Sequence, residues 1–256
     1  MRTNSWAGKM SVDKCVKVLA TGDVHSPDYL KLYMESIKRI NNDIDIILWV
    51  GDMVRRGRVE ALEPVLRATR EKFPNTKIVS IYGNEEYWGL EEVFRKRYQD
   101  IIWLDDEYVV INVRDVKVGV VGTRGALERP TRWQRKNKPE LWRIYRERPK
   151  RIELLLREAK AKADIVILAS HYTVGFETAK GEPESILPEM GSRAMMDVVL
   201  RTKPDVVFHA HAHNAKVLEV EIGHVKICNV SIVARKNVWT GNVCRIKRGL
   251  EVFFKS

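Results

Sequence analysis

Cysteine is scarce in this sequence of 256 residues, which contains only Cys15, Cys228 and Cys244. An odd number of cysteines at irregular spacing argues against a disulfide framework, and the absence of a C-x-x-C pair argues against a cysteine zinc site. We therefore expect a reducing compartment, the cytoplasm. No apolar run approaches the ~18 residues of a membrane-spanning helix, so we expect no membrane partner.

The chain also lacks features that would divide or target it. Its first 20 residues have no apolar core of the kind found in signal peptides. No internal repeat or low-complexity linker is visible. At this length, and with 45% hydrophobic residues, we expect a single domain over residues 1–256, of which residues 1–10 form a flexible extension.

Histidine is scarce too, but three of the six histidines lie within five residues, at positions 209, 211 and 213. They follow a short apolar run that ends at Phe208, and alternate residues of a strand point the same way. A lone histidine is usually a satisfied, partly buried side chain. Three at alternating positions indicate a metal site instead, because imidazole is the commonest metal ligand.

Four other short apolar runs end in a residue that can bind a metal. The runs cover residues 16–20, 46–50, 77–82 and 165–169, and they lead to Asp23 and His25, to Asp52, to Asn84 and to His171. Runs this short and apolar are typical of buried strands in a sheet covered on both faces. Because ligands of open α/β sheets gather outside the carboxyl ends of the strands, the runs predict one shared site.

The remaining pattern predicts helices between the first strands and hairpins near the end. Apolar residues at helical spacing predict helices over residues 28–41, 59–72, 90–98 and 149–162. Strands over 107–112 and 117–121 are expected to form a hairpin, and further strands are expected at 216–221, 225–230, 242–247 and 250–254. This order is compatible with two mixed sheets packed face to face, with helices outside.

The polar residues at the strand ends follow an ordered signature, through which the sequence resembles the calcineurin-like metallophosphoesterases. That family carries D-x-H, G-D, G-N-H-[DE], a single His and G-H-x-H. The matching residues here are Asp23-Val24-His25, Gly51-Asp52, Gly83-Asn84-Glu85-Glu86, His171 and Ala210-His211-Ala212-His213, within residues 16–214. The resemblance implies an α/β fold, a four-layer α-β-β-α sandwich of two mixed sheets.

The resemblance also implies a binuclear metal centre. One metal is expected to be held by Asp23, His25, Asp52 and His213, and the second by Asp52, Asn84, His171 and His211, with Asp52 bridging. The motif register leaves His209 outside the ligand set.

Catalytic positions follow from the same resemblance. Arg56 matches an arginine that members with a G-D-x-x-D-R-G motif use on phosphate, and Asn84 and Glu85 lie at catalytic positions. Three residues depart from the family pattern. Glu85 replaces the usual catalytic His, Arg55 replaces an Asp, and Ala210 replaces the Gly before the first His of the last motif.

The formal net charge of +11 is concentrated in one segment. Residues 124–162 contain 14 Lys/Arg and 5 Asp/Glu, a local net charge of +9. Pro130, Pro139 and Pro149 are expected to break helices, so we expect residues 123–150 to form an irregular, lid-like insertion near the metal edge. Its candidate substrate-binding residues are Arg124, Trp133, Arg135 and Trp142.

Mixed histidine, aspartate and asparagine ligation suits Mn, Fe, Zn or Ni over Ca or Mg, and we favour Mn. Two metals about 3.5–4 Å apart clamp an in-line displacement at phosphorus, and a hydroxide that bridges them attacks the phosphoryl group. The sequence therefore predicts a metal-dependent phosphatase or phosphodiesterase that acts on phosphorylated small molecules.

Two alternatives stay open. The basic segment with its tryptophans also suits a metal-dependent nuclease acting on DNA or RNA, because cations bind the backbone and aromatic rings stack on bases. A non-catalytic scaffold on the same fold is the third candidate, since Glu85 stands where the family has its catalytic His. The sequence does not distinguish monoesters from diesters or define an oligomeric state.

Overall fold

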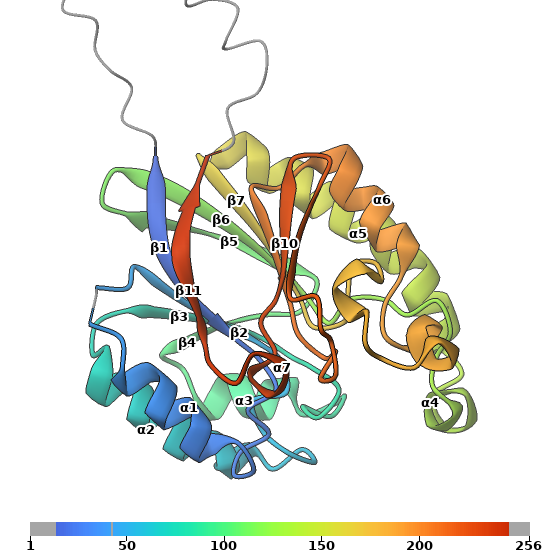
Figure 1. Ribbon diagram of the computed structural model, residues 1–256, viewed down its shortest axis with the longest axis horizontal. Helices are drawn as coiled ribbons and strands as arrows, with labels where there is room; N and C mark the ends of the chain where they lie inside the picture. The colour runs from blue at the N-terminus through green and yellow to red at the C-terminus, as the bar shows by residue number, and fades with distance from the viewer. Residues whose placement is uncertain (1–13, 42, 246–256) are drawn as a thin grey trace, which may run out of the picture.

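Two β-sheets lie face to face in the computed structural model, which describes residues 14–41 and 43–245 (Figure 1). The extension expected over residues 1–10 and the strand expected over 250–254 lie outside the described residues. So does the end of the strand expected over 242–247.

The first sheet has five strands in the order β11-β1-β2-β3-β4. Strands β1 to β4 are parallel to one another, and β11 pairs antiparallel with β1. The bounds are β1 (Cys15–Thr21), β2 (Ile46–Val50), β3 (Lys77–Ile81), β4 (Ile101–Leu104) and β11 (Trp239–Cys244). Three of the predicted apolar runs thus become neighbouring parallel strands whose carboxyl ends lie at the same edge.

The second sheet has six strands in the order β5-β6-β7-β8-β10-β9, with the antiparallel strands β5 and β9 at its edges. Strands β6, β7, β8 and β10 are parallel. The bounds are β5 (Glu107–Val113), β6 (Val116–Thr123), β7 (Ile165–Ser170), β8 (Val206–His209), β9 (Glu219–Ile222) and β10 (Val225–Asn229). The predicted hairpin is confirmed, whereas β9 begins later and β11 begins earlier than expected.

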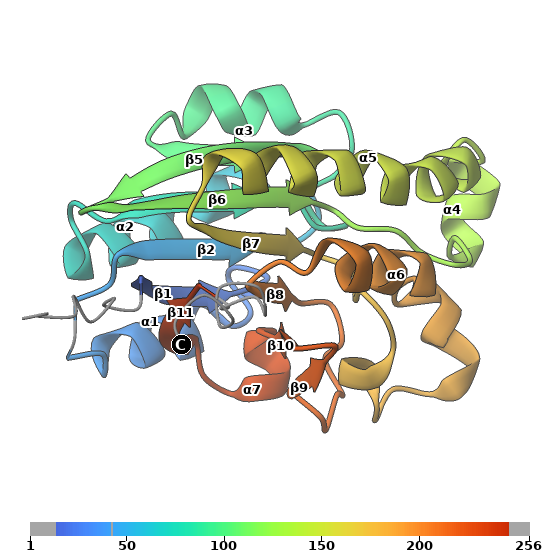
Figure 2. The same cartoon turned by 90° about the horizontal axis from the view of Figure 1, so that it is seen from above.

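Helices cover the outer face of each sheet (Figures 1 and 2). Helices α1 (Leu30–Lys38), α2 (Glu63–Lys72) and α3 (Glu91–Arg97) cover the first sheet, and α5 (Leu141–Lys162) and α6 (Arg193–Thr202) cover the second. Short helices complete the chain: α4 (Arg132–Asn137), α7 (Ile232–Arg235) and the 3-10 turns η1 (Val59–Leu62), η2 (Glu177–Ala179) and η3 (Glu184–Glu189).

Strand β1 shows why the layers form. Val16, Val18 and Ala20 belong to the apolar cluster between the two sheets, whereas Leu19 belongs to the cluster under the helices of the first sheet. Successive strand residues point to opposite faces, so an entirely apolar strand is buried on both sides. The expected four-layer α-β-β-α sandwich is confirmed.

Helix α5 corrects the expectation that Pro149 ends a helix. The helix runs from Leu141 to Lys162 with Pro149 inside it. A proline in a helix interior costs about 3 kcal/mol, but Leu141, Tyr145 and Ile152 are buried at helical spacing on both sides of it. Their packing against the second sheet outweighs that cost. Much of the expected irregular segment is therefore helical, as α4 and the first two turns of α5.

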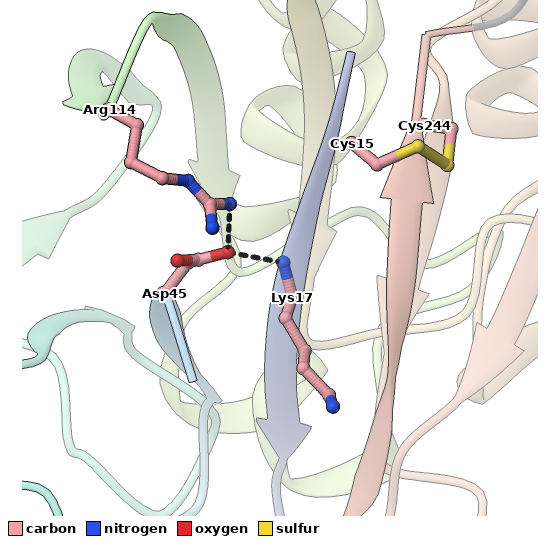
Figure 3. Close-up of a disulfide and its surroundings, with 5 residues drawn as sticks. All are labelled: Cys15, Lys17, Asp45, Arg114 and Cys244. Carbon is pink, nitrogen blue, oxygen red and sulfur yellow. Dashed lines mark hydrogen bonds and ion pairs between the residues drawn. A yellow bond between two sulfur atoms is a disulfide. The ribbon is translucent and has the colours of Figure 1, made fainter. Parts of the chain in front are cut away.

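The cysteine pattern gave a second wrong expectation, because Cys15 and Cys244 form a disulfide (Figure 3). They lie directly opposite each other in the β1–β11 pair. Nearby, the Asp45 carboxylate accepts hydrogen bonds from the Lys17 backbone N–H and from Arg114 in the turn between β5 and β6. Cysteine usage therefore no longer supports a reducing compartment, although Cys228 is free and buried. None of the helices in the described ranges has the length and apolar character of a membrane span.

Candidate metal centre

The predicted ligands follow shortly after the carboxyl ends of β1, β2, β3, β7 and β8, which lie at the same end of the two sheets. The structure brings them together in two groups, Asp23 with His25 and His213, and Asp52 with His171 and His211. Within each group, one ligand atom of each residue lies within 4.8 Å of the others. Asn84 joins the second group, because its Oδ1 lies 3.2 Å from His171 Nε2.

Asp52 lies between the two groups. Its Oδ2 is 3.9 Å from His25 Nε2 in the first group and 3.4 Å from His171 Nε2 in the second. Its Oδ1 accepts a hydrogen bond of 2.7 Å from the Glu85 backbone N–H. One oxygen is thus held by the backbone while the other faces both groups, as a bridging carboxylate requires.

The loops that carry the ligands are strained. Asp23, His25, Asp52 and His211 have φ angles of 60°, 41°, 52° and 68°. Residues other than glycine rarely adopt this left-handed region, and each such residue costs on the order of 1–3 kcal/mol. The loops hold one another in place, since Asp23 N–H donates to Gly51 O, His25 N–H to Asp52 O and His211 N–H to the Asp23 carboxylate. Strain of this kind is typical of functional sites.

The candidate ligand His171 and the histidine left outside the predicted ligand set, His209, differ in their hydrogen bonds. His171 Nδ1 donates to the Val50 carbonyl at 3.0 Å, which leaves Nε2 facing Asp52 and Asn84. A metal-bound histidine commonly has this arrangement. In His209, Nδ1 donates to the Ala210 carbonyl and Nε2 accepts from the Thr178 hydroxyl. Burial lowers the pKa of His209 to about 4, so the ring is neutral and has no lone pair left for a metal.

The charges at the site favour a cation. Burial raises the pKa of Asp23, but the hydrogen bond and charge of His213, with His171 and His25, outweigh burial and hold the pKa below its usual range. Burial lowers the pKa of His171, but the Asp52 carboxylate raises it more, to about 9. A positive charge on Nε2 is therefore favoured, and a bound cation supplies the same charge. Asp23 Oδ1 is buried and has no hydrogen-bond partner among the described residues, so it also fits a metal ligand.

Two glycines allow the ligand loops to pack this closely. A Cβ on Gly83 would lie 2.1 Å from Asp52 Oδ1, and a Cβ on Gly51 would lie 2.7 Å from His171 Nδ1. Gly51 also has a φ of 83°, which favours glycine. The glycines of the G-D and G-N pairs are thus explained by contact with the ligands themselves.

Glu86 is a residue of the site to which the sequence assigned no role. Its carboxylate is buried and accepts hydrogen bonds from the backbone N–H groups of Asp52, Gly83 and Val54 at 2.8, 2.7 and 3.1 Å. Burial and the nearby Asp52 charge raise its pKa to about 7. Glu86 therefore joins the loops after β2 and β3. Its match to the last position of the G-N-H-[DE] signature was its sequence signal, and its hydrogen-bond partners are known only from the fold.

Two residues to which the family pattern gave catalytic roles, Arg56 and Glu85, lie in adjacent loops after β2 and β3. Arg56 is exposed, and its backbone N–H donates to Glu85 Oε2 at 2.5 Å. The Glu85 carbonyl accepts from Gly57 N–H, which also joins the two loops. Glu85 thus orders the backbone that carries Arg56. The catalytic roles of both residues stay predictions.

A cavity of about 540 Å³, which we call the aromatic cavity, borders Asn84 and His211 of the centre. Its other walls come from the loop after β3, from α4 and from the start of α5, and they include Trp133. Figure 2 shows α4 at the end of the molecule to which the arrows of β6 and β7 point. Lys138, which was not among the candidate residues, also lines this cavity.

The other three substrate-binding candidates do not line this cavity. Arg124 is 1% exposed and donates to the Gly83 and Glu86 carbonyls and to the Glu91 carboxylate, so it orders the loop after β3. Arg135 is paired with Glu189 at 3.4 Å. Trp142 lines a separate cavity. Spacing along the chain could not separate these residues, because Arg124 is buried directly after β6, whereas Arg135 and Trp142 lie on α4 and α5.

Two adjacent groups of histidine and aspartate ligands at the carboxyl edge of a two-sheet α/β sandwich are typical of metal-dependent hydrolases. The chain belongs to the calcineurin-like phosphoesterase family, whose model matches residues 16–215. The resemblance stated above is thereby confirmed, and the chain is a metal-dependent phosphoric ester hydrolase. No curated protein matches the chain.

Several solved structures share the fold. Phosphopantetheinyl hydrolase (PptH) from Mycobacterium tuberculosis has a TM-score of 0.58 at 12% identity, covering 86% of this chain and 90% of that chain. NAD nucleotidase (NadN) from Haemophilus influenzae has a TM-score of 0.59 at 13% identity, covering 93% of this chain and 55% of that chain. GAP50, the anchor in the inner membrane complex of Plasmodium, has a TM-score of 0.54 at 12% identity, covering 86% and 72%. At these identities the likeness shows the fold alone.

Proposed function

We propose that this protein hydrolyses phosphate esters of small molecules at a centre of two divalent metal ions, with Mn favoured. The observation that carries the proposal is the position of Asp52 Oδ2 between two complete groups of ligands. The names of two fold neighbours, a phosphopantetheinyl hydrolase and an NAD nucleotidase, are consistent with small phosphorylated substrates.

The ligand assignment follows the two groups. Asp23, His25, Asp52 and His213 hold one metal, and Asp52, Asn84, His171 and His211 hold the other. When bound, the two cations supply the charge that activates water and neutralises the phosphoryl oxygens. The strained loops hold the ligand atoms in place before metal binds, so little reorganisation is needed.

The remaining residues of the site act on the substrate. The exposed Arg56 guanidinium forms no ion pair with residues 14–41 and 43–245, and it can donate to phosphoryl oxygens as they gain charge. Residues 123–150 act as a lid, because α4 and the start of α5 form one wall of the aromatic cavity. Glu85 lies at the position from which the leaving group is protonated.

Small substrates are favoured over nucleic acid by the lining of the aromatic cavity, and four arginines of the lid are engaged within the protein. Arg124 and Arg148 are buried in internal hydrogen bonds, and Arg129 and Arg135 both pair with Glu189. Among the described residues, Lys138 supplies the only ammonium or guanidinium group to the lining of the aromatic cavity. A groove that follows a nucleic acid backbone needs several such groups. The complete ligand groups argue equally against a non-catalytic scaffold.

The test is reconstitution of chelator-treated protein with Mn, Zn, Fe or Ni, followed by elemental analysis and assays on p-nitrophenyl phosphate and bis-p-nitrophenyl phosphate. We expect about two metals per chain and hydrolysis that depends on them. His211→Ala is expected to lower the metal content, whereas His224→Ala, at an exposed turn histidine, is the matched control. Full hydrolysis by the chelator-treated protein would contradict the proposal.

A further inference from the structure

Four aromatic rings contribute to the lining of the aromatic cavity. Tyr87 and Trp88 come from the loop after β3, Trp133 from α4, and Tyr172 from the residue after the ligand His171. Its volume of about 540 Å³ lies in the range of small-molecule sites, about 300–1,000 Å³. Because Asn84 and His211 also line it, a group bound there is adjacent to the metal centre.

The inner rings of the cavity are held rigidly. The Arg124 guanidinium lies 4.4 Å from the Trp88 ring centroid, and the buried Arg148 guanidinium lies 5.5 Å from it. The Tyr172 ring is 4.9 Å from the His211 ring, and its hydroxyl faces Gln134 and Tyr145. Rings that are fixed before binding lose little conformational entropy when a ligand packs on them.

The outer rings are exposed. Trp133 is 64% exposed and Tyr87 is 46% exposed, although both are large apolar groups. They come from two different segments, Trp133 from the lid and Tyr87 from the loop after β3, yet line the same cavity. Such a pair provides apolar faces that a planar ligand can remove from water.

The cavity also has one polar group with no partner inside the protein. Lys138 is half-buried, and its ammonium makes no hydrogen bond or ion pair with the part of the chain that the structure describes. By contrast, the Gln134 amide is fully used, since it accepts from Thr131 N–H and donates to Tyr145 and Tyr172. Lys138 is therefore available to a hydrogen-bond acceptor on the ligand.

We propose that the aromatic cavity binds a planar heteroaromatic group of the nucleobase type, carried by the phosphate ester that is hydrolysed at the metal centre. This inference rests on the proposed function. Rings on the walls suit a flat π-system, because aromatic pairs gain stacking beyond the burial of area. An alkyl chain would leave Lys138 without an acceptor. A polynucleotide would require further cations along a groove.

The experiment compares adenosine 5′-monophosphate with ribose 5-phosphate, which lacks the base, on the Mn-loaded protein. We expect a kcat/KM about tenfold or more higher for the nucleotide. Trp133→Leu is expected to lower kcat/KM for the nucleotide by about fivefold to thirtyfold and to leave ribose 5-phosphate unchanged. Trp133→Phe keeps a ring and is expected to retain most of the rate.

Trp142→Leu is the matched control, because Trp142 is also exposed on the same basic segment but lines a different cavity. Equal kcat/KM values for the two esters, or equal effects of the Trp133 and Trp142 variants, would overturn the inference.

Isothermal titration of adenosine, which has no phosphate, separates this inference from the proposed function. If neither ester is hydrolysed with any metal, the proposed function fails. In that case the aromatic site is still supported if adenosine binds and Trp133→Leu weakens the binding. It is overturned if adenosine does not bind, or if Trp133→Leu leaves the binding unchanged.

Discussion

Replacing Glu86 with alanine tests whether one buried carboxylate holds two ligand loops together. The change removes the acceptor for the backbone N–H groups of Asp52, Gly83 and Val54. A buried donor left unsatisfied costs about 1–3 kcal/mol, and water that enters the space recovers part of this. We expect Glu86→Ala to lower the free energy of unfolding by about 3–5 kcal/mol.

Glu86→Gln separates the hydrogen bonds from the volume of the side chain. The single amide oxygen can take the place of Oε2, which accepts from both Asp52 and Gly83. The amide nitrogen then faces the Val54 N–H, so one donor is lost instead of three. We expect a loss of about 1–2 kcal/mol. The geometry therefore predicts that the free energy of unfolding is lowest for Glu86→Ala, intermediate for Glu86→Gln and highest for the native protein.

The assay is urea denaturation of chelator-treated protein, followed by titration of Mn by calorimetry. Because Glu86 positions Asp52, metal affinity is expected to fall about 10- to 100-fold in Glu86→Ala, as for other partners of metal ligands. Glu92→Ala, at an exposed carboxylate in the first turn of α3, is the control. The reasoning is refuted if Glu86→Ala costs no more stability than Glu92→Ala, or if it keeps native metal affinity.

Four further predictions follow from the site and the fold. Asp52→Asn is expected to remove nearly all phosphate ester hydrolysis while circular dichroism stays native; unchanged turnover with full metal occupancy would disprove the bridging role. Glu85→His is expected to speed hydrolysis of alkyl phosphates more than aryl ones, because poor leaving groups need a proton donor; equal effects would remove Glu85 from leaving-group chemistry. The Cys15–Cys244 bond links residues 229 apart, for which chain entropy gives at most about 5 kcal/mol, so the double serine variant is expected to lose about 2–4 kcal/mol in urea denaturation; no loss would contradict this. Raising salt from about 50 to about 200 mM is expected to raise KM less than tenfold, whereas a loss of about a thousandfold would indicate a nucleic acid substrate.

The sequence by itself predicted the strands that carry the candidate ligands, and their order. Short apolar runs are typical of buried parallel strands, and a polar residue directly after such a run then lies at the carboxyl edge of the sheet. Asp23, Asp52 and His171 could therefore be assigned to one site from local pattern alone. The exclusion of His209 came instead from the motif register of the family resemblance, and it stays a prediction. Both ring nitrogens of His209 are used in hydrogen bonds, in agreement with it.

The tertiary structure decided what depends on contacts between distant residues. Cys15 pairs with Cys244 only because β1 and β11 are neighbours in a particular register, which spacing does not encode. Helix α5 continues through Pro149 because the second sheet buries residues on both sides of it. Local charge likewise could not show that Arg124 is buried under the ligand loops while Lys138 lines the aromatic cavity. Side-chain direction is set by packing, so composition shows that a segment is basic, and only the fold shows where each charge points.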